Sequence, residues 1–491
     1  MLASQLSRAM ALRQLPPCTC LRAAGQLAAR PVPSRTFSAL APRLTRPRPV
    51  ARHPAPQPPR RAYAVRPKPT EPLVIDGTSY PRDAFTNATP TILDKLPRRL
   101  HLQPSHPIGI LRSLIESHFS SFAHLNSLSP IVTVAQNFDD LGFPADHPGR
   151  ALTDSYYLNE RHMLRTHTSA HEVELFRQGL DQFLVTADVY RRDEIDRSHY
   201  PVFHQMEGCN VVDPAQGGIE RLERENAEMR AALGAANIVI EDPTGVETAT
   251  NPYQAEHDPR TARIIAEHLK NSLNGLVLKL FGGRAGGDGA EPLRVRWIEA
   301  TFPWTAPSYE VEVMFNGKWL EILGCGVVRQ AALDKSGVGH KQGWAFGLGL
   351  ERIAMVLFSI PDIRLFWSSD ARFSNQFRQG DITTFKPYSR FPECYKDLAF
   401  WLPEASGAQG GDKVQQWHEN DFMELVRDEA GDLVEGVQLI DEFTHPKTGR
   451  VSRCYRFNYR SMDRSLSNEE VNVIQERVQE RVTSEMGVEV R

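Results

Sequence analysis

Apolar residues recur at two different spacings along this 491-residue chain, and each spacing predicts a different kind of element. Repeats of three and four residues place side chains on one helical face, whereas strict alternation places them on one strand face. Helical spacing runs over residues 108–122, 219–233 and 265–280, and we expect Ser105 to cap the first of these helices and Asp258-Pro259 to open the third. Alternation runs over 309–315 and 319–323, separated by Asn316-Gly317, a strong signal for a hairpin turn. The two patterns together predict an α+β fold.

From about Tyr388 the chain changes to short, closely spaced elements. The pattern predicts a strand at 398–402, a helix at 420–429, strands at 433–443 and 450–460, a helix at Ser467 and a strand at 487–491. Ser467 and Glu470 match the capping box that starts such a helix. The order βαββαβ is ferredoxin-like, a topology shared with RNA-recognition modules. Residues 388–491 are therefore expected to form a second domain after a main domain over 67–387.

One strand of this expected second domain alternates aromatic and polar residues. Tyr455, Phe457 and Tyr459 share one face, and Arg456 and Arg460 share the other. We expect the aromatic rings to pack beneath the helices rather than to stack on bases. The arginine face is the better candidate for binding RNA.

The N-terminal segment has a composition of its own. Twelve arginines occur before Glu71, the first acidic residue, among many Ser, Ala and Pro. An acid-free, Arg-rich start without a continuous apolar core is typical of a mitochondrial transit peptide, here residues 1–66. The alternative interpretation is a disordered basic arm that binds RNA. Loss of those arginines takes the basic total from 57 to 45 against 60 acids, so the formal net charge falls from −3 to −15. An acidic body must attract RNA through local basic patches.

Cysteine spacing argues against a structural zinc site, and hydropathy argues against a membrane-spanning segment. Cys209, Cys325, Cys394 and Cys454 show no zinc-type spacing, which favours a reducing compartment and no structural metal. No apolar run approaches the length that spans a membrane.

Two separated segments carry the candidate chemistry. In 189–208, Arg191 ends a strand, and Phe203, Gln205 and Glu207 alternate on the next. One face thus offers a cation, an aromatic plane, an amide and a carboxylate, which suits a ligand with phosphate, a flat base and an amine. In 343–358, a short apolar strand passes through Gly347 and Gly349 into a helix with Arg352 on its first turn. Glycines there allow close backbone approach, and two arginines can clamp a triphosphate at both ends.

These two segments resemble motifs 2 and 3 of the class II aminoacyl-tRNA synthetases. The pattern is most similar to the single-chain phenylalanyl-tRNA synthetase family. Further matching segments are RTHTSAH (165–171), RWIEATFPWTAPSYEVEV (296–313), WLEILGCGVV (319–328) and IPDIRLFW (360–367). The resemblance spans residue 75 to the end. It implies a class II antiparallel sheet flanked by helices, a ferredoxin-like anticodon-binding domain and attachment of phenylalanine to tRNA(Phe) in the mitochondrial matrix.

The resemblance also implies roles for individual residues. Arg191 would bind the α-phosphate of ATP, Arg352 the γ-phosphate, His199 the β- and γ-phosphates, and Phe203 would stack on adenine. The ATP-binding set is Arg191, Ser198, His199, Tyr200, Phe203, Gly347, Gly349 and Arg352. The phenylalanine-binding set is His167, Ser169, Ala170, His171, Gln205, Glu207, Phe302, Trp304 and Ala345. Glu310 and Glu321 are candidates to hold Mg²⁺, and Arg456 and Arg460 to bind tRNA.

The amino-acid pocket raises a question of selectivity. Trp304 stands where the family usually has Phe, and Ala345 matches the small residue beneath the para position of the substrate ring. An apolar pocket rejects an added hydroxyl only on the order of a hundredfold, so tyrosine misacylation is expected. The chain offers no segment large enough for an editing domain between its two domains.

Two other functions fit parts of the pattern. A non-catalytic paralogue that binds RNA would not need Arg191, Phe203, Gln205, Glu207 and Arg352 together. An α-subunit of a heterotetramer typically carries an N-terminal coiled coil and lacks an anticodon domain. A self-contained chain instead predicts a monomer without a partner subunit, in which loss of the second domain spares amino-acid activation.

Overall fold

The large sheet organises the main domain of the computed structural model, which describes residues 71–283, 291–388, 391–403 and 417–491. Eight strands follow the order β3-β6-β7-β12-β11-β10-β9-β8. They are β3 (Ala123–Leu125), β6 (Gln182–Tyr190), β7 (Val202–Val212), β8 (Ile238–Glu241), β9 (Leu293–Phe302), β10 (Thr305–Phe315), β11 (Lys318–Val328) and β12 (Gln342–Gly349). The six central strands are antiparallel, and only the short edge strands β3 and β8 pair in parallel within this sheet. The predicted hairpin is confirmed: Asn316 and Gly317 adopt φ of 50° and 75° between β10 and β11.

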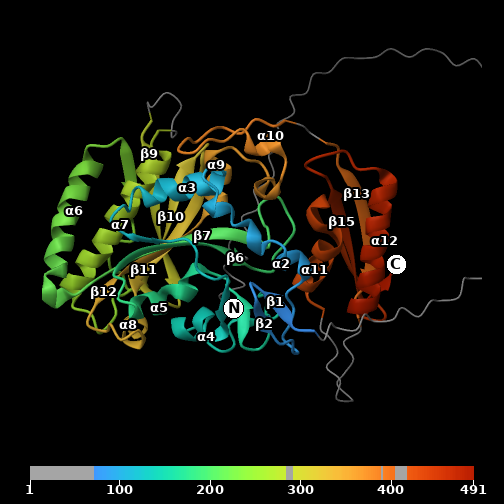
Figure 1. Cartoon of the computed structure of the whole chain (residues 1–491), viewed down its shortest axis with the longest axis horizontal. Coiled ribbons are helices and arrows are strands. Elements are labelled where there is room, and N and C mark those ends of the chain that lie inside the picture. The colour runs from blue at the N-terminus through green and yellow to red at the C-terminus, as the bar shows by residue number, and fades with distance from the viewer. Residues whose placement is uncertain (1–70, 284–290, 389–390, 404–416) are drawn as a thin grey trace, which may run out of the picture. The chain divides into compact units, whose positions relative to one another are not determined.

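Long helices cover this sheet (Figure 1). They are α3 (Pro107–Glu116), α7 (Pro259–Phe281) and α9 (Leu350–Leu357), and α6 (Gly218–Gly234) packs on α7. The helix of α7 begins as the sequence indicates, because the Asp258 side chain accepts from the Thr261 N–H and Pro259 occupies the first turn. The cap of α3 differs from the expected one: His106 rather than Ser105 accepts from the Ile108 N–H. The helix also ends at Glu116, earlier than the apolar spacing indicated.

Short elements complete the main domain. Two small sheets pair β1 (Leu73–Ile75) with β2 (Thr78–Tyr80) and β4 (Ile131–Thr133) with β5 (His162–Leu164). The short helices are α2 (Pro90–Leu93), α4 (Val134–Asn137), α5 (Glu172–Arg177), α8 (Gln330–Lys335) and α10 (Ala371–Ser374). Short 3₁₀ helices of the main domain lie at Leu96–Arg98, Leu100–Leu102, Asp139–Leu141, Pro148–Arg150, Thr168–His171, Pro214–Gln216 and Ile363–Trp367, and another, Gly431–Leu433, belongs to the second domain. The Thr168–His171 turn leads directly into α5 beneath β6 and β7, and so brings the RTHTSAH segment to the sheet.

The second domain has the predicted βαββαβ order. Its elements are β13 (Cys394–Trp401), α11 (Glu419–Ala430), β14 (Val434–Thr444), β15 (Val451–Tyr459), α12 (Asn468–Met486) and β16 (Glu489–Val490). The sheet order β14-β15-β13-β16 is ferredoxin-like. Tyr455, Phe457 and Tyr459 are fully buried in the core shared with α11 and α12, which confirms that they pack beneath the helices. The α+β fold class is therefore confirmed.

The predicted transit peptide, residues 1–66, lies outside the described residues. Among those that are described, no helix combines the length and apolar character needed to cross a bilayer. Residues 67–491 form one compact unit.

Candidate active site

Four neighbouring strands of the large sheet place small and acidic residues in a row on one face. Glu207 of β7 pairs with Gly347 of β12, Gly347 with Gly324 of β11, and Gly324 with Glu310 of β10. Residues paired directly across strands share a face. A Cβ on Gly347 would meet no atom within 4 Å, whereas one on Gly324 would collide with the Phe302 ring at 2.7 Å. The row is thus a trough with a carboxylate at each end and Phe302 over its middle.

Arg191 and Phe203 lie farther along the same face. Val189 pairs with Phe203, so Arg191, two residues on, projects from the same side. The Arg191 Nε donates to the Thr166 carbonyl at 2.8 Å, and its guanidinium carbon is 5.4 Å from the Phe203 ring centre. Burial lowers the pKa of Arg191, but a guanidinium stays charged at physiological pH. A fixed cation beside an aromatic plane suits a nucleotide phosphate and its base.

Gln205 stands between that pair and the trough. It lies opposite Gly349, whose own Cβ would also meet no atom within 4 Å. Two consecutive odd positions of β12 therefore carry no side chain, and the amide of Gln205 faces open space. Ala345, two residues before Gly347, continues the row opposite Cys209 and is buried.

The aromatic side of the site is a stack of four rings. His167 lies parallel to Phe143 at 5.6 Å and nearly parallel to Trp304 at 5.9 Å, and Trp304 contacts Phe302 at 5.8 Å. Burial lowers the pKa of His167 to about 3, so its imidazole is neutral. Within the described part of the chain, neither ring nitrogen finds a hydrogen-bond partner of good geometry. Buried polar atoms of this kind are normally satisfied, which points to a bound ligand.

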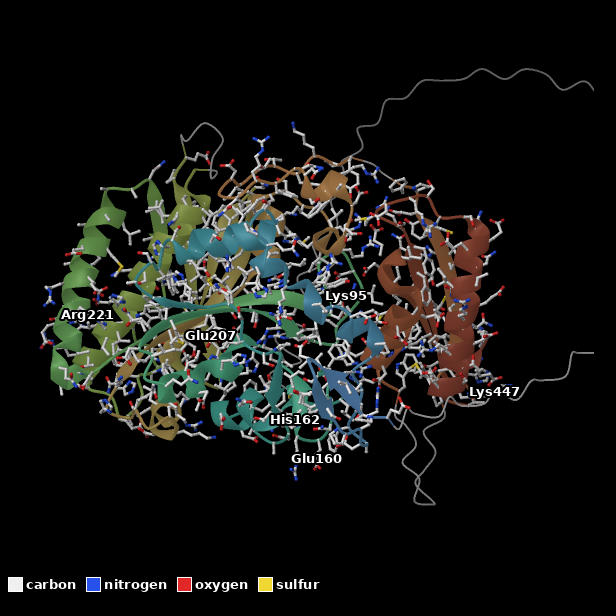
Figure 2. The ribbon with its side chains drawn as sticks, in the orientation of Figure 1. Lys95, Glu160, His162, Glu207, Arg221 and Lys447 are labelled. Carbon is white, nitrogen blue, oxygen red and sulfur yellow. The ribbon has the colours of Figure 1, made fainter. Side chains whose placement is uncertain are left out.

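Two carboxylates meet at the buried end of the trough. Glu207 lies in the interior of the domain (Figure 2), and Glu172 approaches it from the first turn of α5. Ligand atoms of Glu172, Glu207 and Cys209 lie within 4.8 Å of one another. Burial raises the pKa of Glu207 to about 7, and burial together with the Glu207 charge raises that of Glu172 well above its usual range. A cationic group such as an ammonium would relieve this repulsion.

The helix α9 brings Arg352 to the opposite end of the trough. A Glu351 oxygen lies 2.6 Å from Nδ1 of the buried His204, and its other oxygen accepts from the His204 N–H at 2.7 Å. This contact fixes the first turn of α9 on β7, so the sheet and the helix hold a constant spacing. Arg352 reaches to 4.0 Å from Glu321. Burial and the charge of Glu321 raise the pKa of Glu310 to about 7.

The loop between β6 and β7 holds the remaining ATP candidates. His199 Nδ1 lies 2.8 Å from an Asp196 oxygen, and Asp196 also accepts from the N–H groups of Ser198 and His199. The hydrogen bond that the Asp196 carboxylate accepts from the ring raises the pKa of His199, which favours the imidazolium. Tyr200 instead donates its hydroxyl to Asp432 at 2.7 Å.

Several predicted residues make contacts within the protein. His171 Nε2 lies 3.0 Å from Arg165, whose buried guanidinium holds this segment to Asp188 of β6, and Ala170 packs in a small apolar cluster. Their contact with phenylalanine stays a prediction. In the second domain, Arg456 forms two 2.8 Å bonds to Asp397, and Arg460 pairs with Glu393 and Glu435.

Three site residues did not emerge from the sequence patterns. Glu172 directly follows the RTHTSAH segment, and its position on the helix that this segment opens was the available signal. Asp196 carried the N-cap-like signature of a turn acid before Ser198. Phe143 stands in an irregular stretch with no periodicity, so only the structure places it against His167.

Comparison with known proteins identifies the family of each domain. The "tRNA synthetases class II core domain (F)" family matches residues 94–216 and 260–377, and the "Ferredoxin-fold anticodon binding domain" family matches 389–491. The fold and site thus define a class II aminoacyl-tRNA synthetase core with a ferredoxin-like second domain.

Proteins of similar sequence show which family within the class II synthetases this chain belongs to. The mitochondrial phenylalanine–tRNA ligase of Saccharomyces cerevisiae is 48% identical over 85% of this chain and 94% of its own. That of Mus musculus is 44% identical over 87% and 91%. The phenylalanine–tRNA ligase alpha subunit of Lawsonia intracellularis is 30% identical over only 55% of this chain. This chain belongs to the phenylalanine–tRNA ligase family.

Proposed function

We propose that this chain activates phenylalanine with ATP and transfers it to mitochondrial tRNA(Phe). The observation that carries the proposal is the trough, which leaves open space over Gly347 and Gly349. Its buried end holds the Glu172–Glu207 pair, which needs a cation, while Arg191 lies farther along the same face and Arg352 lies beside Glu321 near the Glu310 end. An α-amino acid with an aromatic side chain and a nucleoside triphosphate match these features together.

In the activation step, a carboxylate oxygen of phenylalanine attacks the α-phosphorus of ATP and pyrophosphate leaves. Most of the catalysis is positioning and neutralisation of charge. Arg191 binds the α-phosphate, His199 the β- and γ-phosphates and Arg352 the γ-phosphate, while Phe203 stacks on adenine. Gln205 and Glu207 hold the ammonium. In the transfer step, the 2′-hydroxyl of the terminal adenosine attacks the acyl carbon and AMP leaves.

The residues at the Arg352 end fit a divalent cation. Glu310 and Glu321 are half-buried acids whose pKa values are raised by burial, and the charge of Glu321 further raises that of Glu310. These two carboxylates would hold Mg²⁺, which supplies positive charge to the phosphate oxygens. Arg352, 4.0 Å from Glu321, then lies beside the same phosphates.

The division of labour along the chain belongs to the same proposal. Residues 1–66 direct the protein to the mitochondrial matrix, 67–387 carry out both chemical steps, and 388–491 bind the anticodon stem. The relatives that are called mitochondrial ligases align along most of this chain, whereas the relative called an alpha subunit aligns with about half of it. That difference supports a monomer without a partner subunit.

Amino-acid-dependent ATP–pyrophosphate exchange tests the proposal. Phenylalanine should support exchange at least about a hundredfold better than any other standard amino acid, with tyrosine next. Charging of tRNA(Phe) should then require Mg²⁺ and ATP. The proposal would be contradicted if no amino acid supported exchange, or if leucine supported it as well as phenylalanine. Sedimentation at low concentration checks the monomer.

A further inference from the structure

The loop from 191 to 201 leaves the catalytic sheet and enters the core of the second domain. The Ile195 side chain is only 7% exposed and belongs to the apolar cluster of the ferredoxin-like domain, together with Val434 and Phe457. The Val437 N–H of β14 donates to the Ile195 carbonyl at 3.0 Å. A residue of the ATP-site loop is therefore a core residue of the other domain.

Charged groups fix both sides of Ile195. Arg427 of α11 donates to the carbonyl of Asp193 at 2.7 Å. Arg197 lies 3.2 Å from both Glu393 and Glu435. Glu435 is almost completely buried and also pairs with the guanidinium groups of two other arginines, so its carboxylate is held rigidly.

The anchored residues lie directly before Ser198, His199 and Tyr200, which are predicted to bind ATP. Asp196 stands between Ile195 and Arg197, and it orients His199 through the 2.8 Å contact to Nδ1. Arg191 and Phe203 flank the loop. The backbone of Asp196 cannot shift without moving an adjacent anchor, so the second domain sets the position of His199 through one intermediate side chain.

We propose that the ferredoxin-like domain is a structural part of the ATP-binding site for amino-acid activation. Ile195 and Arg197 are positioning residues: the second domain holds them, and they hold the loop so that His199 faces the phosphates. The inference rests on the proposed function. It changes the expectation from sequence that activation is independent of the second domain, because two anchors of the loop lie in that domain.

Two substitutions in the full-length protein test the inference. Ile195→Ala removes the side chain that packs in the apolar core of the second domain, and Arg197→Gln removes the charge that pairs with Glu393 and Glu435. Each should raise the KM for ATP in pyrophosphate exchange about tenfold and leave the KM for phenylalanine within about twofold, since small misplacements of positioning groups cost up to about a hundredfold. Ile195→Val and Arg197→Lys should recover most of the loss.

Matched controls separate positioning from stability. Val478→Ala removes apolar volume from the same core but from α12, and Arg464→Gln removes an arginine as exposed as Arg197 that pairs with Glu470. Both controls should keep the wild-type KM for ATP, even where the melting temperature falls. The inference is overturned if the loop variants keep that KM, if the controls raise it equally, or if the KM values for ATP and phenylalanine rise together.

A binding measurement keeps this test independent of the amino acid. The shift of melting temperature with Mg-ATP alone should be smaller for Ile195→Ala than for wild type and Val478→Ala. Wild type that binds ATP but shows no phenylalanine-dependent exchange would contradict the proposed function and leave the loop comparison intact. Equal ATP shifts in all three proteins would overturn the inference about the loop.

Discussion

Strands β7 and β15 occupy similar places in their two sheets, yet they present their polar residues differently. Both are long, antiparallel and paired on both sides, and both alternate functional-looking side chains. On β7, an oxygen of Glu207 is buried with no hydrogen-bond partner among the described residues. On β15, Arg456 already has a carboxylate partner in Asp397. A polar residue becomes a strong ligand candidate when the fold supplies no partner of its own.

The largest expected effect comes from Arg191 at the end of the β7 face. Arg191→Met should lower the rate of phenylalanine-dependent exchange by on the order of 100- to 1000-fold, because a preorganised charge at the reacting phosphate is lost. Exchange kinetics and a melting curve measure this. Arg221→Met, on the exposed α6 surface (Figure 2), is the control and should be silent. A loss below tenfold would place Arg191 outside the phosphate site.

The next largest effect is expected for amino-acid selectivity, which depends on the apolar residues of the proposed phenylalanine pocket. We propose that Phe302, Trp304 and Ala345 line the phenylalanine pocket. No polar group is assigned there to reject the tyrosine hydroxyl, so kcat/KM should favour phenylalanine over tyrosine only on the order of a hundredfold. Exchange with each amino acid measures the ratio. Tyr-tRNA(Phe) added to the enzyme should persist; its rapid hydrolysis would reveal an editing activity that this interpretation excludes.

The Glu172–Glu207 pair predicts a pH effect. The ammonium binds the ionised carboxylate, and the pKa of Glu207 is about 7, so kcat/KM for phenylalanine should rise about tenfold from pH 6 to pH 8. Glu207→Gln should flatten this profile.

The stability of the unliganded protein should change in the opposite direction. The raised pKa means that the folded state binds more protons than the unfolded state between the usual glutamate pKa and about 7. The free energy of unfolding should therefore fall as pH rises through that window, and less so in Glu207→Gln. Parallel pH profiles of variant and wild type would contradict the assignment of this group.

The smallest effect is expected on β15. Asp397→Asn should release Arg456 for RNA, lowering the KM for tRNA about two- to threefold and steepening its salt dependence by about one phosphate contact. Arg456→Gln should change that KM less than twofold, because Asp397 already occupies the guanidinium. A loss of tenfold or more in Arg456→Gln would mean that tRNA displaces Asp397, so the two strands would then differ less than the structure indicates.

The sequence predicted local features more completely than distant ones. Features that depend on neighbouring residues could be predicted from the sequence: the Asp258 cap, the Asn316-Gly317 turn and the βαββαβ order. Glu207 was predicted because alternation fixes its face. The contact of Glu172 with Glu207 and the burial of Ile195 in the second domain depend on pairings between segments far apart in the chain, and no periodicity of the sequence predicts them. Likewise, alternation along the strand predicted which face Arg456 lies on, but it did not predict the ion pair with Asp397.

The ends of the large sheet have a consequence for behaviour at high concentration. Its outermost strands, β3 and β8, are only three and four residues long and run parallel to their neighbours. Short borders offer few unpaired backbone groups to an incoming strand from another molecule. Crowded copies of the protein therefore have little template for joining sheet to sheet through the edges of this large sheet, because both of its border strands are short.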